Sequence, residues 1–245
     1  MLLEICCDTI ESAKNAELAS ADRIEFCSDL YSGGLTPSFA LVMKLKEILT
    51  IPINILIRPR QGNFVYSDYE FQVILKDIEM FKNLNVNGFV CGTLNDKAEV
   101  NLEQTKQIIE QCYPLPLTFH RAVDNTKNYL EEMKRLFNIG VTKVLTSGAY
   151  NSVDLGFDNI LVAHNSFGHK MTIMPGGGVN LNNISKFKEI GIKEIHSSAS
   201  KLAVDNNYYN PELNGMGIII DKNTAYYKTA DVQNIKSMIE LIRNK

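Results

Sequence analysis

The sequence predicts an α/β fold, a single (β/α)8 barrel of the TIM type, from three observations. The chain has 245 residues, and eight strand–helix units of about thirty residues each fill roughly that length. Short apolar runs alternate with longer amphipathic stretches along the chain, which is typical of a parallel sheet. We identify no low-complexity tract or linker, so residues 1–245 are expected to form one domain.

The eight predicted strands are short apolar runs separated by helical patterns. They span residues 2–6, 22–27, 53–58, 86–91, 115–120, 141–146, 171–175 and 193–197. Thr36 and Pro37 are interpreted as the N-cap and first residue of a helix, and Gly140 and Gly191 as C-caps. The stretch 200–230, which includes Asp205, Asn206 and Asn207, has no clear pattern, and a last helix is predicted from about residue 231.

The composition argues against nucleic acids and membranes as partners. Lys and Arg number 25 against 28 Asp and Glu, giving a formal net charge of −3, so we expect no broad basic surface. The first residues lack a basic region, and no apolar run has the length of a membrane span, which predicts a cytoplasmic protein. The five scattered cysteines are expected to be reduced. A small molecule or a metal ion is the expected partner.

The alternation of apolar and polar residues predicts which strand side chains face the barrel interior. Leu3 and Ile5 alternate with Glu4 and Cys6, which turns the latter pair inward. The same pattern turns inward Glu25, Cys27, Asn54, Leu56, Arg58, Thr118, His120, Glu194 and His196. A buried charge is costly unless it is paired, so we expect Arg58 to compensate Glu4 and Glu25. Two interpretations stay open, a structural ion-pair layer and a functional site at the C-terminal mouth of the barrel.

The catalytic candidates are acids and histidines expected at this mouth. His120 is suited to proton transfer because imidazole titrates near neutral pH, and Asp124 or Glu25 is expected to orient it. A purely structural histidine is the alternative. The full candidate set is Glu4, Glu25, His120, Asp124 and His196.

Arginines and glycines near the strand ends predict an anion-binding mouth. Arg58 and Arg60 can bind a carboxylate or phosphate through paired hydrogen bonds. Loops after strands seven and eight commonly bind phosphate through backbone N–H groups in this fold. The predicted anion-binding residues are Arg58, Arg60, Arg121, Ser147, Gly176, Gly177, Gly178, Ser197 and Ser198. Surface salt bridges and a tight glycine turn are the alternatives.

Two cysteines repeat one pattern on successive strands, Glu4-Ile5-Cys6 and Glu25-Phe26-Cys27. Neighbouring strands lie about 4.8 Å apart, so these thiols can meet. Soft thiolates select Cu(I) or Zn over hard ions, which makes Cys6 and Cys27 candidate metal ligands. Packing as small apolar residues is the alternative.

The sequence resembles the CutC copper homeostasis family over roughly its first 200 residues. The motifs that carry the resemblance are LEICC at 3–7, ADRIEFC at 21–27, GGLTPS at 33–38, IRPR at 57–60, YSD at 66–68, TFHRA at 118–122, VLTSG at 144–148, MPGGGV at 174–179 and HSSA at 196–199. The resemblance implies a barrel fold, a cytosolic protein associated with copper tolerance, and Cu(I) binding by Cys6 and Cys27. Asn125 stands where the family usually has Met, so any copper site here depends on the cysteines.

Three functions therefore compete. The first is copper homeostasis through Cu(I) bound by thiolates. The second is a metal-independent barrel enzyme acting on a small polar or anionic substrate at the strand C-terminal mouth. The third is a non-catalytic scaffold, and assembly into a homo-oligomer is compatible with all three.

Overall fold

The computed structural model describes residues 1–205, 219–221 and 224–244. Eight parallel strands form one sheet with the order β7-β6-β5-β4-β3-β2-β1-β8, and a parallel bridge between Gly176 and His196 joins its two ends. The strands are β1 (Leu2–Cys7), β2 (Arg23–Phe26), β3 (Ile53–Leu56), β4 (Gly88–Cys91), β5 (Leu117–Phe119), β6 (Lys143–Thr146), β7 (Thr172–Pro175) and β8 (Glu194–Ser197). The predicted barrel is confirmed, and each predicted strand overlaps an observed one.

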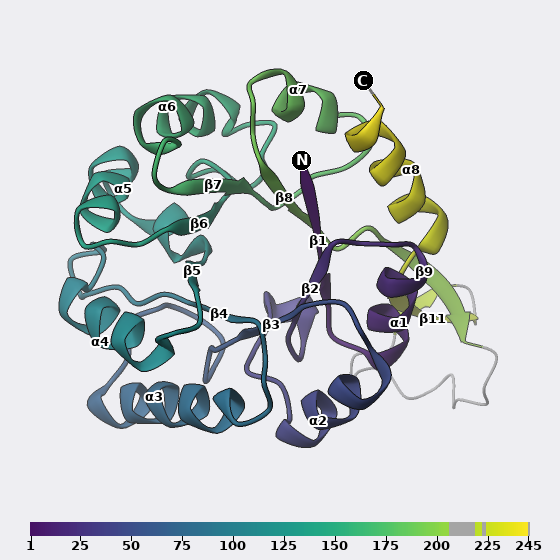
Figure 1. Ribbon diagram of the computed structural model, residues 1–245, viewed down its shortest axis with the longest axis horizontal. Helices are drawn as coiled ribbons and strands as arrows, with labels where there is room; N and C mark the ends of the chain where they lie inside the picture. Colours follow the sequence, from purple (N-terminus) through teal and green to yellow (C-terminus); the bar gives the residue numbers. More distant parts are fainter. Residues whose placement is uncertain (206–218, 222–223, 245) are drawn as a thin grey trace.

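Helices form a ring outside the strands, as the view down the barrel shows (Figure 1). The α-helices are α1 (Ile10–Leu18), α2 (Phe39–Ile48), α3 (Asp68–Lys82), α4 (Leu102–Cys112), α5 (Tyr129–Asn138), α6 (Phe157–Phe167), α7 (Ile184–Glu189) and α8 (Val232–Arg243). Short 3-10 helices, η1 (Leu30–Ser32) and η2 (Arg121–Asn125), follow β2 and β5. The last helix begins at Val232, as the sequence predicts.

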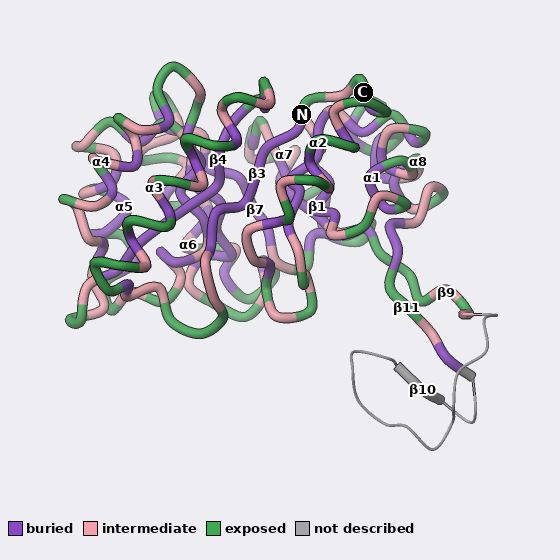
Figure 2. Tube along the Cα trace, turned by 90° about the horizontal axis from the view of Figure 1, so that it is seen from below, coloured by how far each residue is buried: buried purple, intermediate pink, exposed green. Residues whose placement is uncertain are grey.

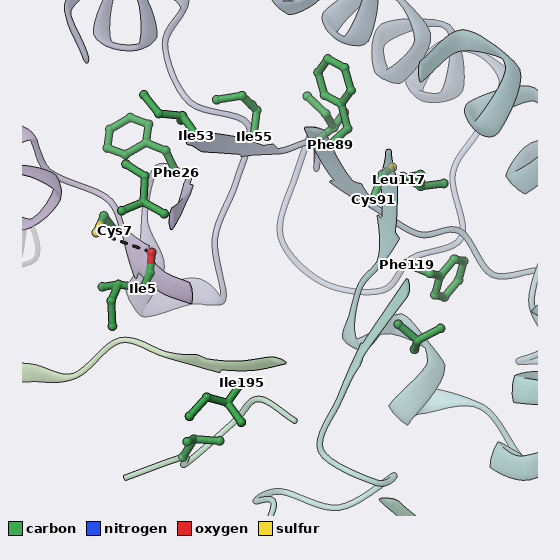
Figure 3. Close-up of a cluster of buried hydrophobic side chains, with 14 of the residues drawn as sticks. Ile5, Cys7, Phe26, Ile53, Ile55, Phe89, Cys91, Leu117, Phe119 and Ile195 are labelled. Carbon is green, nitrogen blue, oxygen red and sulfur yellow. Dashed lines mark hydrogen bonds between the residues drawn. The ribbon is translucent and has the colours of Figure 1, made fainter. Parts of the chain in front are cut away.

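The main apolar core lies between the strands and the helices. The strand residues that face the helices include Ile5, Phe26, Ile55, Phe89 and Ile195, and all are fully buried (Figure 3). Their alternation with Glu4, Glu25 and Asn54 leaves the polar side chains on the inner wall of the barrel. The period-two pattern thus positions the polar site as well as the core.

Helix ends follow the local sequence with one exception. Gly140 and Gly191 follow α5 and α7 at φ +88° and +81°, a conformation that glycine adopts without strain. Ser38, and not Thr36, is the N-cap of α2. The predicted cap at Thr36 is wrong because its N–H donates to Arg58 O at 2.9 Å and its hydroxyl accepts from Arg58 N at 2.9 Å. These bonds tie Thr36 to the loop after β3, and the helix begins later.

A three-stranded antiparallel sheet follows the barrel strands and projects away from the barrel (Figure 2). It pairs β9 (Ser200–Asp205) with β11 (Thr224–Ala230) in antiparallel fashion, and β10 (Ile219–Asp221) pairs with β11. Asn206 and Asn207 lie outside the described residues. Within the part of the chain that the structure describes, no helix is long and apolar enough to cross a membrane.

Candidate functional site

Strand register brings the polar residues of β1, β2 and β8 together on the inner wall. Glu4 pairs with Arg23 of β2 on one side and with His196 of β8 on the other. Cys6 pairs with Glu25, one pleat closer to the C-terminal mouth. All five side chains are buried. The barrel therefore holds one continuous polar cluster along β1.

Glu4 is fully satisfied within this cluster. Arg23 forms an ion pair with its carboxylate, Asn54 donates to Oε2 at 3.0 Å, and His196 Nδ1 lies 2.8 Å from Oε1. Burial alone would raise the pKa of Glu4, but the hydrogen bond with His196 and the charge of Arg23 lower it to about 2. Glu4 is thus a permanent negative charge that orients the imidazole.

The base that compensates the buried acids is Arg23, and the prediction that assigns this task to Arg58 is wrong. Arg23 bridges Glu4 and Glu194, with its Nη2 2.6 Å from Glu194 Oε2. Lys143 adds a second contact to Glu194 at 2.6 Å. Arg23 occupies the same alternation phase as Glu25, so the period-two pattern could have found it.

Arg58 lies beyond the end of β3, above the level of the acids. Its guanidinium donates to the carbonyl oxygens of Ser32 and Gly34 at 3.1 Å and of Gly62 at 2.8 Å. Within the residues that the structure describes, it forms no ion pair with either buried acid. Arg58 thus braces the loops after β2 and β3.

Glu25 is buried with one oxygen left without a partner. Cys6 Sγ lies 3.5 Å from Oε1, and His196 Nδ1 lies 4.0 Å from Oε2, which has no hydrogen bond among the described residues. Burial raises the pKa of Glu25 to about 7. Burial alone would lower the pKa of His196, but the charge of Glu25 and the hydrogen bond with Glu4 raise it. The predicted candidates Glu4, Glu25 and His196 therefore adjoin one another.

The thiols of Cys6 and Cys27 are neighbours at the upper end of the same cluster. They pack with Leu56 and Val90 in a small apolar group inside the barrel, and neither forms a disulfide. A hydrogen bond with the Cys27 thiol, followed by burial, raises the pKa of Cys6 well above its ordinary range. The structure brings the two predicted metal ligands together, with a carboxylate and an imidazole next to Cys6.

Cys6 also forms part of the wall of a pocket of about 660 Å³ at the mouth. The pocket lies between the end of β1, the start of α1, the loop after β2, the residues after β8, and β11. Its lining includes Asp8, Asp29, Ser198 and Lys228. Cys6 is the residue of the cluster that this pocket reaches.

His120 lies in a separate group, away from Asp124. Its Nδ1 accepts from Ala122 N–H at 3.2 Å, so the neutral ring carries its proton on Nε2. That Nε2, Arg58 Nε and the Tyr66 hydroxyl are buried donors without a partner among the described residues. The centroid of the Phe64 ring lies 4.9 Å from the centroid of the His120 ring and 5.0 Å from Cζ of the Arg58 guanidinium. Sequence reasoning missed Tyr66, whose loop position carries no alternation signal.

Asp124 organises the loop after β6, and the expectation that it orients His120 is wrong. It accepts from Thr146 Oγ1 at 2.5 Å, from Ser147 N and Oγ at 2.9 Å, and from Ala149 N at 3.0 Å. Arg121 Nε donates to it at 2.9 Å. These bonds occupy the carboxylate, because η2 turns Asp124 toward β6 before the chain enters α5.

The predicted anion-binding residues divide into separate groups. Arg60 forms an ion pair with Glu70 at the start of α3. Arg121 lies against the glycine loop after β7, where a Cβ on Gly177 would be 3.0 Å from its Nη1. Near this loop, Ser147 accepts a hydrogen bond from Arg121 at 2.7 Å, and Gly176 and Gly178 flank Gly177. At the end of β8, the Ser197 hydroxyl donates to Val179 O at 2.8 Å, and the Ser198 hydroxyl lies 3.2 Å from that of Ser200.

Comparison with known proteins gives a consistent result. The CutC family model matches residues 1–201. A CutC family protein of Salmonella typhimurium is 41% identical over 201 residues, covering 82% of this chain and 81% of that protein. A solved Streptococcus agalactiae CutC structure, whose name refers to copper homeostasis, has a TM-score of 0.76 and 29% identity over 81% of this chain and 98% of its own. Phosphoribosyl anthranilate isomerase of Thermotoga maritima, with a TM-score of 0.60, 15% identity and 98% of both chains covered, shares the fold alone.

Proposed function

Because this chain belongs to the CutC family, we propose that it serves copper homeostasis by binding Cu(I) through the thiolates of Cys6 and Cys27. The contact between these two thiols carries the proposal. Cu(I) favours soft sulfur ligands in a low-coordinate site, and two adjacent thiolates supply one. We place this function in the cytoplasm, where thiols stay reduced.

The surroundings of the thiol pair support such a site. Leu56 and Val90 pack against it inside the barrel. Gly34 allows the loop after β2 to approach, since a Cβ there would lie 3.3 Å from Cys27 Sγ. Cys6 forms part of the pocket wall, so an ion can reach the pair from one side.

The Cys6→Ser, Cys27→Ser double variant is expected to bind Cu(I) at least about 100-fold more weakly than the wild type. Each serine replaces a thiol with a hydroxyl group, and the hydroxyl oxygen is a hard ligand that Cu(I) binds weakly. Competition with a colorimetric cuprous chelator under reducing conditions measures this. The matched control is Cys112→Ser, which removes a buried thiol at the end of α4. Equal competition by the double variant and the control would overturn the proposal.

An enzyme acting on a small anionic substrate is the second candidate, and the Arg121 guanidinium beside Gly177 favours it. Arg121 is partly exposed and already held by Asp124 and Ser147. A pre-oriented guanidinium beside a glycine loop can bind a phosphate or carboxylate with little reorganisation. Of the three arginines predicted to bind an anion, Arg58, Arg60 and Arg121, Arg121 is the one that lies beside the glycine loop.

Inorganic phosphate is expected to raise the melting temperature of the wild type by a few degrees, relative to chloride at equal ionic strength. Arg121→Met is expected to lose this shift, because its guanidinium supplies the charge at the glycine loop. Arg60→Met, which removes an arginine paired with Glu70, is expected to keep it. An undiminished shift in Arg121→Met would exclude this anion site. If the protein is a non-catalytic scaffold, phosphate should not raise its melting temperature, and the double cysteine variant should bind Cu(I) as the wild type does.

A further inference from the structure

We infer that Cys6, Glu25 and His196 form a binding site for a divalent cation of the zinc class, with a ligand set different from that of the thiol pair. One sulfur, one oxygen and one nitrogen of these residues all lie within 4.8 Å of one another. The separation from Cys6 Sγ to Glu25 Oε1 is 3.5 Å. Ligand atoms around a tetrahedral zinc ion lie roughly 3.5 Å apart, so small side-chain rotations complete the site.

The unpartnered oxygen of Glu25 is a second, independent observation. A buried carboxylate oxygen without a donor is rare in folded proteins and indicates a missing partner. A cation between Glu25, Cys6 and His196 supplies that partner. The orphaned oxygen is thus explained by the same ion that the three donors fit.

The charges of the inner wall also favour a cation. When Glu25 is ionised, three carboxylates, those of Glu4, Glu25 and Glu194, face two basic side chains, Arg23 and Lys143. One negative charge is therefore left for His196 or a bound ion to neutralise. A divalent ion bound by Glu25 and the Cys6 thiolate does so within the buried cluster.

Glu4 prepares the imidazole for this role. Metal-bound histidines usually direct their second ring nitrogen to a carboxylate, which fixes the ring and strengthens the ligand. Glu4 lies 2.8 Å from one nitrogen of His196, which leaves the other nitrogen for the ion. Cys6 borders the pocket, so a fourth ligand can be water or a small molecule entering from solvent.

The donor set selects the class of ion. One thiolate, one imidazole and one carboxylate suit the borderline ions Zn²⁺ and Co²⁺, whereas Cu(I) prefers a second sulfur and Mg²⁺ or Ca²⁺ prefer oxygen alone. The site needs Cys6 and not Cys27. Cys6 is common to both proposed sites, so removal of Cys27 is the change that separates this site from Cu(I) binding at the thiol pair.

The test is titration of the full chain with Co²⁺ alone, followed by ultraviolet absorption of the thiolate–Co²⁺ bond, and competition for Zn²⁺ with a chromogenic chelator. Cys6→Ser is expected to abolish the thiolate band, and Glu25→Gln to weaken Zn²⁺ binding at least about tenfold. Far-ultraviolet circular dichroism confirms that each variant is folded. Glu25→Gln conserves side-chain shape, which makes its loss of affinity specific to the charge.

Cys27→Ser is the discriminating control. It removes the thiol pair and leaves the sulfur, oxygen and nitrogen donors in place, so the Co²⁺ band and the Zn²⁺ affinity are expected to stay within about threefold of wild type. Equal losses in Cys27→Ser and Cys6→Ser would mean that the ion binds the thiol pair, and would overturn the inference. Unchanged Zn²⁺ affinity in both Cys6→Ser and Glu25→Gln would show adventitious binding elsewhere and also overturn it.

Discussion

Arg23→Met is expected to lower the free energy of unfolding by about 3–5 kcal/mol, because it leaves buried carboxylates without their base. Arg23 contacts both Glu4 and Glu194 on the inner wall, and its side chain is 10% exposed. A carboxylate that cannot be solvated must then be protonated or must disrupt the barrel interior. Urea unfolding at neutral pH, followed by far-ultraviolet circular dichroism, measures the loss.

Arg60→Met provides the matched control for this prediction. Arg60 also pairs with a glutamate, Glu70, but its side chain is 36% exposed. A solvent-screened pair of this kind is worth under about 1 kcal/mol. The Glu4→Gln, Arg23→Met double variant should lose less than the sum of the two single variants. Additive losses, or a loss at Arg23 as small as that at Arg60, would contradict a paired buried cluster.

His120 is expected to make the protein about 3 kcal/mol less stable at pH 4.5 than at pH 7. Burial and then the charge of Arg58 lower the pKa of His120 to about 3, from an ordinary value of 6.5. The unfolded chain therefore takes up a proton below about pH 6.5 that the folded chain refuses until about pH 3. The free energy of unfolding is therefore unaffected by protonation of His120 above about pH 6.5, and it decreases as the pH falls from there toward about 3.

The difference between wild type and His120→Asn isolates this effect from the acids that titrate in the same range. Unfolding free energies measured across pH 4–8 should show the variant losing about 3 kcal/mol less on acidification. His169→Asn, at an exposed position between α6 and β7, should reproduce the wild-type profile. Parallel profiles for wild type and His120→Asn would show that the folded protein accepts a proton at His120, contrary to its burial.

The inner face of the barrel could be read from the sequence because a strand has a period of two. Leu3 and Ile5 pack toward the helices, so the alternate residues Glu4 and Cys6 point into the barrel. This assignment needs no information about the neighbouring strands. The glycines that end α5 and α7, Gly140 and Gly191, are likewise recognised from the local sequence. The barrel, the inward acids and the inward cysteines therefore follow from short-range patterns alone.

Partner choice within the barrel depended on tertiary structure. Alternation predicts which face of the sheet a side chain lies on. Its position along the barrel axis depends on the register between neighbouring strands. Register places Arg23 beside Glu4, whereas Arg58 lies past the end of β3 and turns to loop carbonyls. The predicted third strand, 53–58, includes Arg58, whereas β3 ends at Leu56 and leaves Arg58 in the loop.

The sequence by itself determined the eight-stranded architecture and which residues line its interior, since both depend on the spacing of apolar side chains along each strand. Only the tertiary structure decided that Cys6, Glu25 and His196 converge, that Asp124 serves the loop after β6, and that Arg121 lies over Gly177. These contacts join segments far apart in the chain. Their distances follow from strand register and loop paths, which no local pattern encodes.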